Sequence, residues 1–358
     1  MGRLWLTVAA CAAAAVADHG SAQAFDGWRQ ESATTIEGKP SAFDYIGLDR
    51  GSHRLFLGHR KEGLQVFDPV SRKLIATLGD TAAHSSDGAT LMPEFDLGIS
   101  NNEDGTITPF KLSTLEAQPS VKVSEELDTS HYDPATKRIF VNAASGKDGQ
   151  DIVVLEAPSL KVLGALHMVA KKLEGADADA KGSLFVAEQD QGKIARIDAQ
   201  AMKLASEWPT PGCEKPTAVA INAADSRLYL ACRKGATTKP ALLVLNLENG
   251  AVVYSAEIGD GVDGIVYDSG MKRIFMACGV SATLHVFEID GPDSYKPLET
   301  LATRQWVKVL ALDAEHGKLY SMAAEGSADA AKKINANVSP FYPNTVFANT
   351  FTVFSYSK

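Results

Sequence analysis

The segment Asp-Thr-Ser-His-Tyr-Asp-Pro-Ala-Thr-Lys-Arg-Ile-Phe-Val, residues 128–141, decides the fold because its pattern recurs along the chain. A polar residue opens a short run, an Asp or Asn stands five residues later, and a second apolar run follows, usually after a basic residue. A degenerate copy at Asp87 lacks the second Asp and the basic residue. The seven copies begin at Asp44, Asp87, Asp128, Glu174, Thr217, Asp263 and Lys308. Repeats of several short strands spaced 41 to 46 residues apart are typical of a β-propeller.

Each repeat can be interpreted as four strands. The first run is a central strand buried on both faces, and the Asp or Asn after it caps a tight turn by accepting hydrogen bonds from backbone amides. The basic residue that follows is placed to pair with that Asp across the turn. Two further runs complete the repeat, such as Val66–Asp68 and 73–78 in the first copy. The sequence therefore predicts an all-β, seven-bladed β-propeller with four-stranded blades.

The last repeat ends after its third strand, residues 350–356, so its fourth strand must come from elsewhere. Residues 28–36, at the N-terminus expected for the mature protein, are the candidate. Pairing the two ends of the chain in one blade closes the ring and removes exposed sheet edges.

The first residues indicate export. A short basic start at Arg3 precedes an apolar stretch, and Ala22-Gln23-Ala24 supplies a small-x-small cleavage pattern. We interpret residues 1–24 as a signal peptide and 25–358 as one propeller domain, periplasmic or secreted. Lipoprotein processing at Cys11 is the alternative. No other segment is long and apolar enough to cross a bilayer, and we expect a monomer.

The repeats resemble the YVTN family of β-propellers, and most closely its periplasmic YncE-like members. The resemblance covers nearly all of residues 40–358 and rests on residues 133–141, on Gly-Val-Asp-Gly-Ile-Val-Tyr-Asp (261–268), and on Cys-Glu-Lys-Pro-Thr (213–217). It implies a periplasmic propeller. Because propellers host binders, lyases, lactonases and oxidoreductases alike, it leaves the activity open.

The repeat register predicts a polar ring at one mouth of the central channel. Its members are Asp44, His84, Asp87, Asp128, Glu174, Thr217, Asp263 and Lys308. Five carboxylates around one axis repel one another unless something compensates. Ca²⁺ or another divalent cation, held by Asp128, Glu174 and Asp263, is one solution, similar in kind to the metal centre of gluconolactonase-like propellers. Raised carboxyl pKa values, pairing with Lys308, and hydrogen bonds to loop amides are the others.

Three cysteines remain after the leader. Cys213 precedes one inner strand and Cys232 ends the neighbouring strand, which favours a disulfide between them in an oxidising compartment. Cys278 holds the equivalent position in the next repeat and competes for the bond.

One long insertion, residues 324–348, separates the second and third strands of the last repeat. By register it emerges at the channel mouth, where it is placed to act as a lid.

These features favour an exported binding protein that receives a small molecule or an extracytoplasmic partner protein at the channel mouth. The alternative is a metal-dependent hydrolase, lactonase or lyase that uses the channel carboxylates, so the sequence leaves enzyme and binder open. A net charge of −9 and a pI near 5.4 argue against binding to nucleic acid.

Overall fold

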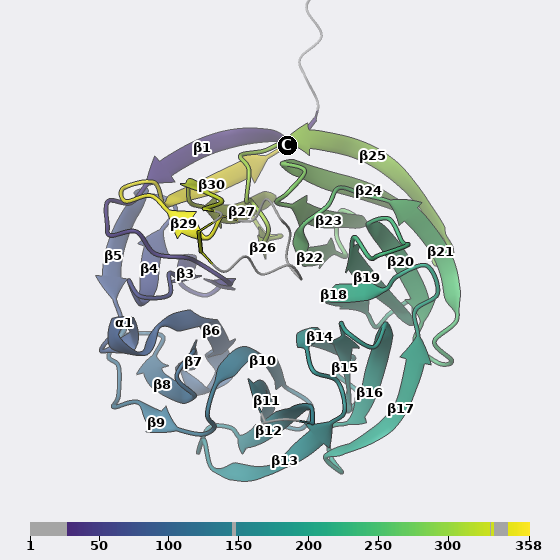
Figure 1. Ribbon diagram of the computed structural model, residues 1–358, viewed down its shortest axis with the longest axis horizontal. Helices are drawn as coiled ribbons and strands as arrows, with labels where there is room; N and C mark the ends of the chain where they lie inside the picture. The colour runs from purple at the N-terminus through teal and green to yellow at the C-terminus, as the bar shows by residue number, and fades with distance from the viewer. Residues whose placement is uncertain (1–26, 145–147, 330, 333–342) are drawn as a thin grey trace, which may run out of the picture.

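The computed structural model describes residues 27–144, 148–329, 331–332 and 343–358. These residues form seven four-stranded antiparallel sheets arranged around a central axis (Figure 1). The prediction of a seven-bladed β-propeller is therefore confirmed. The predicted leader, residues 1–24 with Cys11, lies outside the described residues.

Each blade runs outward from the axis in chain order, except the last. Blade one contains β2 (Ile46–Asp49), β3 (Arg54–Gly58), β4 (Leu64–Asp68) and β5 (Lys73–Thr77). Blade two contains β6 (Ser86–Met92), β7 (Leu97–Asn102), β8 (Thr106–Lys111) and β9 (Val121–Lys122), with short helices α1 (Thr81–His84) and η1 (Pro93–Phe95). Blade three contains β10 (Leu127–Asp133), β11 (Arg138–Ala144), β12 (Gln150–Glu156) and β13 (Val162–Met168). Blade four contains β14 (Leu173–Ala178), β15 (Ser183–Glu188), β16 (Lys193–Asp198) and β17 (Lys203–Pro209).

Blade five contains β18 (Lys215–Asn222), β19 (Arg227–Arg233), β20 (Ala241–Asn246) and β21 (Val252–Glu257). Blade six contains β22 (Val262–Asp268), β23 (Arg273–Cys278), β24 (Thr283–Gly291) and β25 (Ser294–Ala302). Blade seven contains β26 (Ala311–Asp313), β27 (Lys318–Ala323), β30 (Thr352–Ser357) and β1 (Arg29–Thr35).

The core lies between neighbouring blades. The second and third strands of a blade are buried on both faces, as β3 shows with Leu55, Phe56 and Leu57 fully buried. Outer strands such as β5 face solvent along most of their length. Burying apolar side chains on both faces of each sheet is the main stabilising contribution of the fold, because every blade covers its neighbour.

The repeating Asp caps the turn between the first two strands, as predicted. Asp133 accepts hydrogen bonds from the amides of Ala135 and Thr136, at 3.1 and 3.2 Å. The predicted partnership with the basic residue is wrong: the Arg138 guanidinium instead donates to the carbonyl oxygens of Ala199 and Gln200 in the next blade. The turn amides and the Thr136 hydroxyl already occupy the Asp133 carboxylate, so the arginine reaches outward.

The two ends of the chain close the ring, as predicted. Strand β1 pairs antiparallel with β30 from Arg29–Ser357 to Thr35–Thr352, and Figure 1 shows the purple β1 beside the yellow β30. Trp28 anchors the start of β1: its amide donates to Glu299 Oε2 at 2.8 Å, and its ring packs edge-on against Phe275.

Cys213 and Cys232 form the predicted disulfide, with Cα atoms 5.7 Å apart. Cys278 is a buried free thiol. None of the helices among the described residues has the length and apolar character needed to span a bilayer. In the predicted inserted loop, β28 (Gly326–Ser327) pairs with β29 (Thr345–Val346), while residues 330 and 333–342 lie outside the described residues.

Candidate functional site

Six of the eight residues predicted at the channel mouth line one cavity. The cavity has a volume of about 450 Å³ and includes Asp44, Asp87, Asp128, Glu174, Asp263 and Lys308 in its wall. Thr217 stands just behind it, where its hydroxyl accepts a hydrogen bond from the wall residue Gln189 at 3.3 Å. The repeat register therefore brings these residues together because each stands at the start of an inner strand or just before it.

Lys308, in the wall of this cavity, connects the first, sixth and last blades. Its ammonium group lies 2.9 Å from Asp44 Oδ1 and 2.7 Å from Asp263 Oδ2. All three residues are less than a tenth exposed. The backbone holds them in register, because the amide of Asp263 donates to the Lys308 carbonyl oxygen at 3.1 Å. One cation therefore compensates two buried carboxylates, as charges out of water require.

Arg60 continues the pairing into blades one and two. Its guanidinium contacts Asp44 and Glu103 and lies 2.8 Å from Asp87 Oδ1. Gly58 makes this approach possible, since a Cβ at that position would lie 2.0 Å from the Asp87 carbonyl oxygen. A residue with a side chain there would push blade two away and separate Arg60 from Asp87.

Arg233 and Lys172 extend the series of ion pairs from Asp263 toward blades four and three. Arg233 contacts Asp263 and lies 3.8 Å from Glu174 Oε1. Lys172 lies 3.9 Å from the same Glu174 oxygen and 2.5 Å from Asp128 Oδ2.

The result is one chain of alternating acidic and basic groups that passes through all seven blades. In order, it runs Asp87, Arg60, Asp44, Lys308, Asp263, Arg233, Glu174, Lys172, Asp128. Its two ends, in blades two and three, are both acidic. The repulsion expected among the ring carboxylates is thus relieved chiefly by cations that alternate with them.

The pKa of Asp44 follows its two cations. Burial by itself raises the pKa of this carboxyl, but Lys308 and Arg60 outweigh burial and lower the pKa from 3.8 to about 2. Asp44 is therefore ionised throughout the physiological range.

Two other ring carboxyls have pKa values near neutrality. Burial raises the pKa of Asp87 to about 8, with repulsion from Asp44 and Asp128 adding to it against the attraction of Arg60. Burial also raises the pKa of Glu174 to about 7, again with neighbouring carboxylates opposing Lys172 and Arg233. The mouth therefore holds carboxyl groups that gain or lose protons close to pH 7.

The carboxylates predicted as metal ligands are separated by cations. Lys172 stands between Asp128 and Glu174, and Arg233 between Glu174 and Asp263. A metal ion bound by these three would have to displace those ion pairs. The metal centre at the mouth stays a prediction.

His84 lies away from the cavity wall. It ends α1, where its ring nitrogens lie 2.6 Å from Asp104 Oδ2 and 3.2 Å from Asp80 Oδ2. The bond to Asp104 raises the pKa of His84. The backbone of Arg60 forms an isolated antiparallel bridge with Ser86, and Arg60, not His84, is part of the cavity wall.

The sequence reasoning placed Arg60 and Arg233 on a basic rim at this face of the channel but did not pair them with the ring carboxylates, and it missed Lys172. Arg60 and Arg233 stand at or just after the end of a second strand, and Lys172 stands two residues before Glu174. Basic residues at these recurring positions were the available signal, whereas Lys308 was found because it occupies the ring register itself.

Comparison with known proteins shows the fold alone. A chain in a crystal structure of a mitotic checkpoint complex superposes with a TM-score of 0.69 at 13% identity, over 88% of this chain and 96% of that one. A chain of the Kuenenia stuttgartiensis hydrazine synthase superposes with a TM-score of 0.67 at 11% identity, over 80% and 94%. No family model and no curated protein matches the sequence. The chain is thus a seven-bladed β-propeller, and membership of the YVTN family stays a prediction.

Proposed function

We propose that the protein is a binding protein whose channel mouth takes a small zwitterionic molecule, one that carries both a carboxylate and an ammonium group. The observation that carries the proposal is the balance of charge in the cavity wall. The wall contains seven carboxyl groups and five cations. With Asp87 and Glu174 protonated, below pH values of about 8 and about 7, the remaining carboxylates equal the cations in number.

The partly exposed groups of the wall are the ones that a ligand meets. The side chains of Lys172 and Asp128 are 42% and 22% exposed, and those of Arg60 and Glu103 are 24% and 40% exposed. Each is half of an ion pair. A zwitterionic ligand can separate such an ion pair and pair its own carboxylate with the cation and its own ammonium group with the anion. No charge is then left uncompensated, whereas a ligand with one charge leaves one group of the wall unpaired. The cavity volume of about 450 Å³ is in the range of small-molecule sites.

Export is part of the proposal. The disulfide between Cys213 and Cys232 is consistent with an oxidising, extracytoplasmic compartment. We therefore propose that the ligand is collected outside the cytoplasm.

The test is calorimetric titration with three matched compounds: alanine, its N-acetyl derivative with the anion alone, and its methyl amide with the cation alone. Alanine is expected to bind, and each relative to bind at least about tenfold more weakly, since a hydrogen bond to a charged group contributes about 1.5–3 kcal/mol. Lys172→Gln and Asp128→Asn should each weaken binding of alanine. Lys239→Gln, in an exposed pair with Glu257 at 2.8 Å, is the matched control.

Equal binding of all three compounds, or no loss in the two mouth variants, contradicts the proposal. If dipeptides and larger zwitterions also give no heat, the small-molecule function is wrong and a partner protein becomes the occupant to test.

The raised pKa values of two carboxyl groups in the cavity wall favour a second candidate function, that of a hydrolase or lyase. Asp87 and Glu174, with pKa values of about 8 and about 7, are suited to move protons near neutral pH. Hydrolysis of lactones or esters that disappears in Asp87→Asn or Glu174→Gln, with ligand binding retained, would support this candidate. A rate unaffected by both substitutions would rule out these residues.

A further inference from the structure

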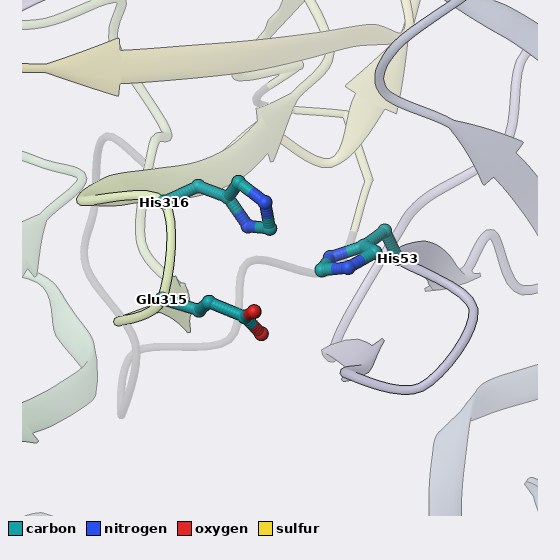
Figure 2. A group of neighbouring side chains, drawn as sticks. All are labelled: His53, Glu315 and His316. Atoms are coloured by element: carbon teal, nitrogen blue, oxygen red, sulfur yellow. The ribbon is translucent and has the colours of Figure 1, made fainter.

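A second cavity lies at the opposite end of the inner strands, where blades one and seven meet. Its volume is about 230 Å³, and His53, Asp313 and His316 are in its wall. His53 belongs to the turn between β2 and β3, whereas Glu315 and His316 belong to the turn between β26 and β27 (Figure 2).

The side chains of His53, Glu315 and His316 point toward one another in Figure 2. One ligand atom from each, an imidazole nitrogen or a carboxylate oxygen, lies within 4.8 Å of the other two. The two imidazole rings meet edge-on, with centroids 4.4 Å apart. Two imidazoles and a carboxylate are a donor set that Zn²⁺ accepts, with the remaining position open to water.

Asp313 stands behind both histidines. Its carboxylate lies 3.0 Å from His316 Nδ1 and 3.6 Å from His53 Nδ1. A ligating histidine commonly donates its second ring N–H to such a carboxylate, which fixes the ring and leaves Nε2 for the metal. Asp313 is 4% exposed and is held by the His316 amide, so it offers a rigid support.

His53 carries an unusual polar atom. Its Nδ1 is buried and, among the described residues, has no hydrogen-bond partner. A buried polar atom without a partner calls for an explanation such as an ion at the site. His53 offers a metal either this Nδ1 or, with Nδ1 hydrogen-bonded to Asp313, now 3.6 Å away, its Nε2.

We propose that His53, Glu315 and His316 form a binding site for a divalent transition metal, with Zn²⁺ the best match. Tetrahedral zinc with bonds of about 2.0–2.2 Å places its ligand atoms roughly 3.3–3.6 Å apart. The side chains must therefore approach one another slightly, which the exposed Glu315 and His316 are free to do. The ion would join the first blade to the last. The positive charge of Lys318 in the same wall is offset by Glu31, 3.0 Å away.

The test uses the full chain, stripped with a chelator and titrated with Zn²⁺ against a chromogenic competitor. One equivalent per chain is expected. His53→Asn, chosen because Asn tolerates the positive φ of 53° at this position, should weaken binding at least about tenfold. His316→Gln and Glu315→Gln should also weaken it. His167→Ala is the matched control, since His167 also faces a carboxylate, Asp151, at 2.8 Å.

Spectra with Co²⁺ provide a second readout. Wild-type protein should give visible bands of a four-coordinate ion, and the His53→Asn, His316→Gln double variant should lose them. Circular dichroism checks that each variant is folded. A wild-type protein that binds no Zn²⁺, or a folded double variant that retains the full equivalent, overturns the proposal. Retention that disappears with Asp128→Asn would instead assign the ion to the channel mouth.

Discussion

The two ends of the propeller channel differ in how far their ionisable side chains are buried and in which partners those side chains have. At the mouth, Asp44, Asp263 and Lys308 are buried and each carboxylate contacts a cation of the protein. At the other end, His53, Glu315 and His316 are half-buried or exposed, and their ligand atoms face one another. Burial forces charges to find partners within the chain, because an uncompensated charge out of water is costly. The partly exposed side chains at the other end do not carry this cost, so their donor atoms can remain available to bind an ion from solution.

The largest effect is expected from removing the central cation of the mouth. Lys308→Met keeps most of the side-chain volume but leaves Asp44 and Asp263 without their shared partner. The free energy of unfolding should fall by about 3–5 kcal/mol, the cost typical of breaking a buried ion pair from one side. Urea denaturation followed by tryptophan fluorescence measures it.

Lys239→Met provides the control, because its pair with Glu257 is exposed and should contribute less than about 1 kcal/mol. A loss below about 1 kcal/mol in Lys308→Met would mean that the chain of ion pairs does not hold the blades together.

The next effect is a pH dependence located at the mouth. The pKa values of Asp87 and Glu174 are raised to about 8 and about 7, so the folded protein binds their protons more tightly than the unfolded chain does. Their contribution to stability is complete below about pH 4 and is lost as the pH rises through 7 to 8. Wild-type stability should therefore fall by about 2 kcal/mol or more between pH 5 and 9, since one pKa unit corresponds to about 1.4 kcal/mol.

The double variant Asp87→Asn, Glu174→Gln should lack this decline, and denaturant unfolding across the pH range compares the two proteins. Groups that both share contribute equally and cancel. Parallel pH profiles for the two proteins would show that these carboxyls titrate near their ordinary values. Asp44, whose pKa is lowered to about 2, contributes in the opposite sense and outside this window, with stability lost as the pH falls below about 4.

The repeat made the fold and the acidic part of the mouth predictable. The repeat register alone places Asp87, Glu174 and Asp263 at equivalent positions. A turn Asp such as Asp133 is identified because it stands five residues after the first residue of its own repeat, Asp128. The cations were harder to place, because the reach of a long side chain such as Arg60 depends on how closely the next blade approaches, and Gly58 sets that distance.

The cluster of His53, Glu315 and His316 could not be predicted from the repeat register alone. His53 and His316 belong to the first and last repeats, 263 positions apart in the sequence. They become neighbours because the pairing of β1 with β30 closes the ring. A local sequence pattern does not show which two turns meet where the ring closes.

The smallest expected effect is on the stability of the metal-free protein when His316, at the exposed end of the channel, is replaced. In chelator-treated protein, His316→Gln removes a half-exposed imidazole whose Nδ1 lies 3.0 Å from Asp313, while the amide of residue 316 continues to bond that carboxylate. The free energy of unfolding should change by less than about 0.5 kcal/mol, as for most surface substitutions. Zn²⁺ at a hundred times the wild-type Kd should then stabilise the wild type by about 2.7 kcal/mol and the variant, which binds the ion more weakly, by less. Thermal or urea unfolding with and without Zn²⁺ measures both quantities. A loss above about 2 kcal/mol in metal-free protein would show that the histidine is a structural part of the turn, and the contrast between the two ends would then disappear.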